Sequence, residues 1–397
     1  MSGTDMHSQQ DNETFRARYR TDDDAVTFLR LFPERGHAVE LAHDLSELRR
    51  QADHAMRIAA GYWPRDFAES CGFDYRCFVY DRYAPNAFAA FREGRHWIGL
   101  SSGLVYVIAE LAVRAAAAAD IPGSSPCAAE PDAHRGFGFR FSDEAFRGGQ
   151  EETARFFRQT QDFDQARMRV MNAIWLDAQT LVWRHEFFHA SLGHTRFADH
   201  ALGLGALDED AAPPDNPDGF EILRAMEFHA DWAGFGSMIK ASRSGLDPVG
   251  SDLVKRFGLR FRVAVMTAAV LLLPLFFRVA EDHAPSTART HPHAATRLQI
   301  FLLRVSDIDE PNERGIWEAG ALDAIGWLVS YARRNSEFSA IAGMLDDATW
   351  KVANRERQRC IDVFDALQEV LGPYAVLPLG HPHQGDIAPI PTDSDGA

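Results

Sequence analysis

The chain has 397 residues, of which 46% are hydrophobic and 25% are charged, as in a globular protein with one large domain or two moderate ones. Its formal net charge of −16 argues against nucleic acid and anionic membrane surfaces as partners, because both are themselves negative. The sparse cysteines, which form no CxxC pair, predict free thiols in a reducing, cytoplasmic compartment rather than the two disulfides of a secreted protein; they are Cys71, Cys77, Cys127 and Cys360.

The first third of the chain alternates between polar and patterned segments. Residues 1–25 are polar and charged, which predicts a disordered N-terminus without a signal peptide. Apolar side chains recur at helical spacing from about 38 to 60. Residues 75–91 are rich in aromatic side chains and broken by Pro85, which predicts a strand, a turn and further extended chain. Residues 96–104 predict a short strand, with an alanine-rich helix after it.

The rest of the chain is mostly helical in pattern. Residues 121–150 are rich in glycine, proline and serine, which predicts a long loop. Helical spacing returns from about 152, and an acidic loop at 201–219 separates that helix from helices at about 219–240 and 249–281. A further helical block runs from about 314 to 371. The pattern therefore predicts a mainly α fold with a small β-sheet (α+β).

One apolar segment raises the question of a membrane. Residues 263–277 carry no charge but are interrupted by Pro274, and a membrane-spanning helix needs ~20 apolar residues. The length favours a buried core helix. A membrane-associated protein that uses residues 249–281 as an anchor is the alternative.

The stretch WRHEFFHASLGH, residues 183–194, contains the elements of a metal site. His185 and His189 are four residues apart, so on a helix both imidazoles lie on one face and can share one ion. Glu186 lies beside them and can act as a general base, which is the chemistry of HExxH zinc peptidases. The alternative is a helix face whose histidines are only solvated or hydrogen-bonded.

The sequence around this motif restricts the third ligand. The metzincin pattern HExxHxxGxxH fails, because Leu192 and Thr195 stand at its glycine and third histidine positions. On a continuous helix the side chain of His194 would point ~140° away from that of His189. We therefore expect His194 to be a capping or surface histidine.

A second helical segment, residues 221–235, offers a carboxylate ligand. Glu227 and Asp231 are four residues apart and share a helical face, so Glu227 can bind zinc while Asp231 accepts a hydrogen bond from a ligand histidine. The large apolar residues around them predict a buried helix, where unpaired carboxylates are costly. Glu221 and Glu209 are the alternative ligands.

HExxH followed by ExxAD resembles the gluzincin metallopeptidases of the CAAX-prenyl-protease and HtpX-like group. The segments PNAFAAFREGRHWIGLSSGL (85–104) and THPHAATRLQIF (290–301) are similar to two further stretches of that group. The resemblance implies a zincin-type core with an HExxH active-site helix. It assigns 26–310 to a catalytic domain with an insertion at about 105–180, followed by a helical region (311–376) packed on it and a disordered tail (377–397).

The resemblance also implies roles for these two segments. The first would supply an edge strand to which an extended substrate adds, after a turn shaped by Asn86, Ala87 and Phe88; a purely structural hairpin is the alternative. Its substrate-strand residues would be Trp97, Ile98, Gly99 and Leu100. In the second segment, His291 and Arg297 are candidate donors to the transition state. A local role in shaping the helix start is the alternative for His291.

These residues predict an enzyme with one Zn²⁺ that hydrolyses peptide bonds in proteins or peptides, with Glu186 as the general base. A catalytically silent zinc-binding interaction protein on the same scaffold is one alternative. A peptidase like the phage-exclusion Lit protein is another. The sequence leaves the oligomeric state open.

Overall fold

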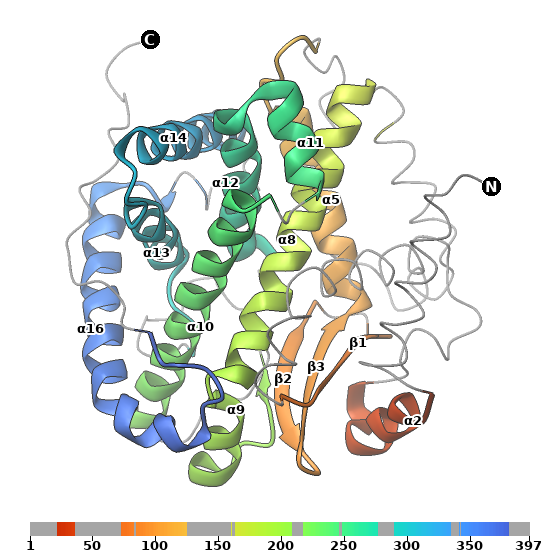
Figure 1. The fold of residues 1–397 in the computed structure, drawn as a ribbon, viewed down its shortest axis with the longest axis vertical. Coiled ribbons are helices and arrows are strands. Elements are labelled where there is room, and N and C mark those ends of the chain that lie inside the picture. The colour runs from red at the N-terminus through yellow and green to blue at the C-terminus, as the bar shows by residue number, and fades with distance from the viewer. Residues whose placement is uncertain are drawn as a thin grey trace.

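The computed structural model of the chain describes residues 22–35, 73–82, 85–124, 160, 163–208, 217–245, 248–276, 290–334, 341 and 343–380. Within these residues the fold is mainly α-helical with one small β-sheet, as predicted (Figure 1). The predicted helix at about 38–60 lies outside the described residues, as do Cys71, Cys127 and Glu209. Cys77 and Cys360 are buried free thiols.

The sheet has the strand order β1-β3-β2-β4. Its strands are β1 (Tyr75–Tyr80), β2 (Ala87–Arg92), β3 (Arg95–Ser101) and the two-residue β4 (Leu207–Asp208). Strand β3 runs parallel to β1 and antiparallel to β2, and β2 is also antiparallel to β4. The segments predicted to be extended, within 75–91 and 96–104, thus form β1, β2 and β3, while β4 lies in the predicted acidic loop at 201–219.

The strand order contradicts the expected substrate strand. Residues Trp97–Leu100 belong to β3, which has a partner along both edges, so its backbone has no free edge for a peptide. Asn86, Ala87 and Phe88 also do not shape a turn, since β2 begins at Ala87 and all three residues are buried. The edge-strand prediction was wrong because strand order depends on how segments pair in space.

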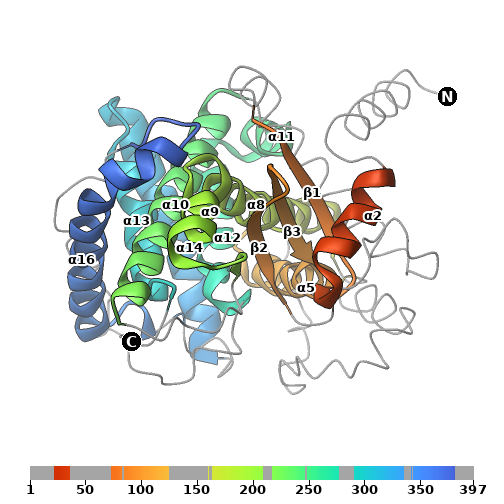
Figure 2. The same ribbon diagram turned by 90° about the horizontal axis from the view of Figure 1, so that it is seen from below.

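The two faces of the sheet pack against different helices (Figure 2). On one face, Phe28 and Phe32 from the region of α2 (Asp22–Leu31) and its following turn η1 (Pro33–Arg35) pack on Phe78, Phe88 and Trp97. On the other face, alternate strand residues join the main core formed with α5 (Ser102–Ala118) and α8 (Gln165–Ser191). Residues 22–25, predicted to be disordered, thus begin a helix whose buried side covers the sheet.

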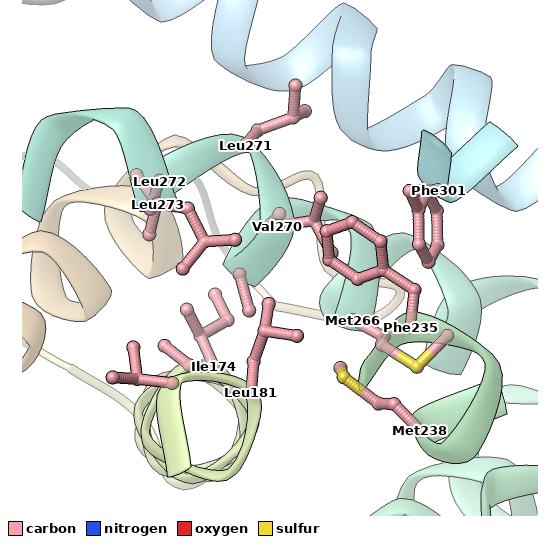
Figure 3. Packing of buried hydrophobic residues seen from close by; sticks show 14 of the residues in the cluster. Ile174, Leu181, Phe235, Met238, Met266, Val270, Leu271, Leu272, Leu273 and Phe301 are labelled. Carbon is pink, nitrogen blue, oxygen red and sulfur yellow. The ribbon is translucent and has the colours of Figure 1, made fainter. Parts of the chain in front are cut away.

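Helix α8 occupies the middle of the molecule and contacts the sheet and several helices (Figure 1). Its main helical neighbours are α5, α10 (Pro217–Arg243) and α12 (Leu259–Phe276). Figure 3 shows Ile174 and Leu181 of α8 facing apolar side chains of α12, with Phe235 of α10 and Phe301 beside them. Phe235 and Phe301 meet edge to face with ring centroids 5.7 Å apart.

The apolar segment of residues 263–277 lies almost entirely in α12, and its described side chains are buried in the core. The single helix expected over 249–281 is two helices, α11 (Pro248–Phe257) and α12, because Gly258 adopts a φ of +87° that an α-helix does not contain. Among the described residues, no helix has the length and apolarity needed to cross a membrane.

The predicted insertion at about 105–180 begins and ends inside the core. Leu111 and the other apolar residues of α5 are buried, and so are those in the first half of α8. Part of the expected insertion, namely α5 and the first half of α8, therefore belongs to the hydrophobic core. Residues 125–159 of the expected insertion lie outside the described part of the chain.

The C-terminal region consists of α13 (Ala294–Ser306), α14 (Pro311–Arg334), α16 (Asp347–Leu371) and a short turn η7 (Gly372–Tyr374). Helix α16 packs against α10 and α13 at the side of the molecule away from the sheet (Figure 1). The chain then returns to α8, where the backbone N–H groups of Val376 and Leu377 donate to the carbonyl of Ser191 at 2.9 and 3.1 Å. Leu377 is buried, so the predicted disordered tail begins inside ordered structure.

A buried ion pair joins α8 to α12. The guanidinium of Arg262 donates to both carboxylate oxygens of Asp177, with 2.8 Å between Nη2 and Oδ1, and its side chain is only 2% exposed. Two residues before it, Arg260 forms an exposed pair with Asp323 on α14. Helix α12 therefore forms two arginine–aspartate ion pairs, one buried and one exposed to solvent.

Asp177→Asn should destabilise the protein by about 3 kcal/mol, because it removes the charge of the carboxylate that pairs with the buried guanidinium of Arg262. The matched variant Asp323→Asn, at the exposed pair with Arg260, should leave the urea midpoint unchanged. Urea unfolding followed by circular dichroism measures both. Equal shifts in the two variants would contradict the assignment of the buried pair.

His96 joins β3 to the short helix α9 (His194–Phe197). Its Nδ1 shares a hydrogen bond with Thr195 Oγ1 at 3.1 Å, and its ring packs between Phe73 and Phe91. Burial and the positive charge of Arg196 lower the pKa of His96 to about 3. The folded protein therefore holds this imidazole neutral at pH values where the unfolded chain protonates it.

His96 should make stability depend on pH. Because its folded pKa lies below its unfolded value of about 6.5, its contribution is complete above pH 6.5 and is lost as the pH falls toward 3. Relative to His96→Asn, the wild type should lose on the order of 2 kcal/mol of unfolding free energy between pH 7.5 and pH 5. Urea unfolding at both pH values measures this difference, and a difference that stays constant contradicts the low pKa.

Candidate metal centre

The centre is built where α8 and α10 cross. On α10, Glu227, Asp231 and Gly234 lie on one face at helical spacing. A Cβ atom at Gly234 would lie only 3.8 Å from the backbone nitrogen of His185, which shows how near the two helices come. This approach carries the carboxylates of α10 to the imidazoles of α8.

Three ligand atoms converge at the crossing. His185 Nε2 lies 2.9 Å from His189 Nε2 and 3.0 Å from Glu227 Oε2, while His189 Nε2 lies 3.1 Å from Glu227 Oε1. All three side chains are buried. Such a set of two imidazoles and one carboxylate could hold a metal ion, and it is the only cluster of this kind among the described residues. These are the three residues that the sequence pattern predicts as metal ligands.

Asp231 and Arg297 form a support behind His185. Asp231 Oδ1 accepts from His185 Nδ1 at 2.9 Å, and its Oδ2 lies 3.1 Å from Arg297 Nε. When His185 is neutral, a proton on Nδ1 leaves a lone pair on Nε2, directed toward the other ligand atoms. Arg297, expected as a donor to substrate, is thus buried and paired with the carboxylate that orients His185.

His291 reaches the centre from the segment before α13. Its Nε2 lies 3.2 Å from Glu227 Oε2, and its Nδ1 shares a 2.9 Å hydrogen bond with Thr290 Oγ1. Its side chain is 21% exposed, more than that of Glu227 at 8%. The helix start is shaped by the neighbouring His293, whose Nδ1 accepts from Ala295 N. His291 therefore belongs to the metal centre and not to the helix cap.

Glu356 of α16 holds this segment in place. Its Oε2 accepts from the backbone N–H of His293 at 2.7 Å and from Thr296 Oγ1 at 2.6 Å. The other carboxylate oxygen lies 3.7 Å from Arg224 Nε on α10. A residue far along the chain thus connects the start of α13 to α10, and no local sequence pattern indicates this contact.

Charges in the centre act strongly on one another. Burial raises the pKa of Glu227, but the neighbouring His291, His189 and His185 outweigh it and hold that pKa well below its usual value. Burial lowers the pKa of His185, but the carboxylates of Glu227 and Asp231 outweigh it and raise that pKa well above its usual value. The centre therefore keeps Glu227 ionised, as a ligand carboxylate must be.

His194 is not the surface or capping histidine that the sequence suggested. Helix α8 ends at Ser191, and Gly193 adopts a φ of +83°, so the chain reverses before His194. His194 is buried, with its Nδ1 3.1 Å from Nδ1 of His189. The expectation assumed that the helix continued, and the reversal at Gly193 turns the ring toward the centre instead.

His229 extends the same contact, and sequence reasoning missed it. Its Nδ1 lies 3.2 Å from Nε2 of His194, and its ring lies against Phe364 of α16 with centroids 3.9 Å apart. Burial lowers the pKa of His229 to about 3 and, with the charge of His189, that of His194 well below its usual value. A polar residue inside the apolar run of α10 was the signal, because a buried imidazole needs partners.

The remaining candidates are separated by their positions. Glu186 lies in the same helical turn as His185 and His189 and is buried, at 2% exposed. Glu221 lies away from the centre, where it forms an exposed ion pair with Arg359 at 2.7 Å. The structure therefore brings together the three candidate ligands, Asp231, His291 and Arg297, and it leaves out Glu221 and the β3 residues.

Comparisons with known proteins add one finding on function. Residues 150–319 match the model of a family described as Peptidase U49, which supports a peptidase family for this chain. The matched segment includes every residue of the centre except Glu356 and Phe364 of α16, and it does not reach the β1–β3 sheet. No curated protein and no solved structure matches the chain.

Glu227→Ala should abolish stoichiometric metal binding, because it removes the one carboxylate among three converging ligand atoms. Glu221→Ala, on the same helix but in an exposed pair with Arg359, is the matched control and should keep the metal content of the wild type. Elemental analysis of the purified, dialysed variants measures metal per chain. Retention in the first variant would show that Glu227 is not the third ligand, and loss in the second would show that the effect is not specific to Glu227.

Proposed function

We propose that the protein is a zinc-dependent metalloendopeptidase. The observation that carries this proposal is the convergence of His185 Nε2, His189 Nε2 and the carboxylate of Glu227. The two nitrogens are 2.9 Å apart, and each lies 3.0–3.1 Å from one oxygen of that carboxylate. The similarity of residues 150–319 to a peptidase family supplies the class of reaction, with proteins or peptides as substrates.

The donor set fits zinc. Ligand atoms of a tetrahedral zinc ion with bonds of ~2.0–2.1 Å lie about 3.3 Å apart, close to the separations in this centre. Two imidazoles and one carboxylate from the protein are the ligands of a catalytic zinc site, which leaves a further position for water or substrate. A structural zinc site would instead fill all four positions with protein ligands.

When bound, Zn²⁺ supplies a Lewis acid that polarises the peptide carbonyl and lowers the pKa of a water molecule to about 7. Glu186 accepts a proton from the attacking water and passes it to the leaving nitrogen. Glu186 lies on the same helix as His185 and His189, so α8 fixes its position relative to these two ligands. Asp231 and Arg297 keep His185 in the tautomer that presents its Nε2 lone pair.

His291 is the donor that we assign to the developing oxyanion. It lies beside Glu227 and is more exposed than the ligands, so a bound substrate can reach it. Arg297 does not share this role in our proposal, because its pairing with Asp231 and its burial direct it to the support of His185.

The supply of the third ligand by a second helix supports assignment to the gluzincins. Glu227 precedes Asp231 on α10 in the ExxAD arrangement that resembles the CAAX-prenyl-protease and HtpX-like group. The resemblance of the 290–301 segment to that group is consistent with the approach of His291 to Glu227. The buried free thiols of Cys77 and Cys360 favour a reducing, cytoplasmic location.

Glu186→Gln should abolish peptide hydrolysis, with a loss of at least ~10²-fold, because the amide cannot accept the proton of the attacking water. The variant should keep its zinc, since Glu186 is not among the three converging ligands. Cleavage of a quenched-fluorescence peptide library by the zinc-loaded protein measures the first effect, and elemental analysis measures the second.

Glu221→Gln is the matched control for that experiment, because it makes the same change on an exposed surface. It should cleave the library at the wild-type rate. A Glu186→Gln variant that retains both zinc and full activity would rule out Glu186 as the general base.

A further inference from the structure

Three imidazole rings lead in a row from the metal centre into the protein interior. His189 contacts His194 through their Nδ1 atoms at 3.1 Å, and His194 contacts His229 from Nε2 to Nδ1 at 3.2 Å. All three rings are buried, and Phe364 of α16 covers the last one. The row brings together α8, the start of α9 and α10, which no local sequence pattern connects.

The row has only one arrangement of protons that satisfies every contact when a cation is bound. A neutral imidazole has one N–H and one lone pair, so each ring-to-ring contact needs one donor and one acceptor. If His189 directs the lone pair of Nε2 toward the other ligands, its proton is on Nδ1 and is donated to His194 Nδ1. His194 then carries its proton on Nε2 and donates it to Nδ1 of His229.

We propose that His194 and His229 are positioning residues that fix the tautomer and ring orientation of the ligand His189. The inference rests on the metal centre of the proposed function and adds a second support to it. The two ligand histidines are then held differently: His185 by the carboxylate of Asp231, and His189 by a row of neutral rings. Residues that orient a metal ligand in this way contribute 10–100-fold to metal affinity.

An amide side chain provides a test of hydrogen bonding apart from packing. Its oxygen accepts and its NH₂ donates, so His194→Gln retains an acceptor for His189 and a donor for His229. His194→Leu removes both. Zn²⁺ affinity, measured by competition with a chromogenic chelator, should fall 10–100-fold in the Leu variant and stay within about threefold of wild type in the Gln variant.

His200→Leu is the matched control, because His200 is an exposed histidine that stacks on Tyr374 outside the row. It should bind Zn²⁺ like the wild type. A His194→Leu variant with wild-type affinity would overturn the proposal, and so would a Gln variant as weak as the Leu variant. If the wild type itself bound no Zn²⁺, the proposed function would fail instead, so the two failures are distinguishable.

The tautomers themselves provide a second measurement that needs no variant to fold. In zinc-loaded wild-type protein labelled with ¹⁵N-histidine, long-range ¹H–¹⁵N spectra report which ring nitrogen carries the proton. The proposal requires Nδ1–H on His189 and Nε2–H on both His194 and His229. A proton on Nδ1 of His194 would overturn it, because that nitrogen could then not accept the hydrogen bond from His189. A histidine that only fills space could carry its proton on either nitrogen.

Discussion

The close crossing of α8 and α10 is the constraint on which the rest of the centre depends. Glu227 and Asp231 reach the imidazoles of α8 because the two backbones come so near at this point that a Cβ atom at Gly234 would lie in van der Waals contact with His185, 3.8 Å from its backbone nitrogen. Because ligand atoms must meet within about 3 Å, a shift of one helix by a fraction of a turn would separate them. The large apolar cluster of α8, α10 and α12 holds this crossing in place (Figure 3).

Two residues of α16 support the crossing at different points. Glu356 of α16 binds the start of α13, which carries His291 and Arg297, while Phe364 covers His229 at the far end of the histidine row. After α16, the chain returns to the carbonyl of Ser191, where α8 ends. Helix α16 therefore belongs to the framework of the centre, although the segment similar to Peptidase U49 ends before it.

The sheet plays a different part from the one its sequence suggested. Its strand order puts β3 in the interior, and helices pack on both of its faces (Figure 2). It thus acts as a layer against which α8 packs, and His96 on β3 connects it to Thr195, just after the reversal at Gly193. The contact links the sheet to the segment that turns His194 toward the metal centre.

The mainly α fold, the two helices of the centre and its three converging side chains were predictable from the sequence, because each follows a local periodicity. Residues four apart on a helix share a face whatever surrounds them, so His185 with His189, and Glu227 with Asp231, were predictable as pairs. The order of the strands, the burial of His194 and the contacts of His229 and Glu356 were not predictable in this way. Those features depend on which segments meet in space and on where a helix ends. The spacing of residues along the chain predicts neither.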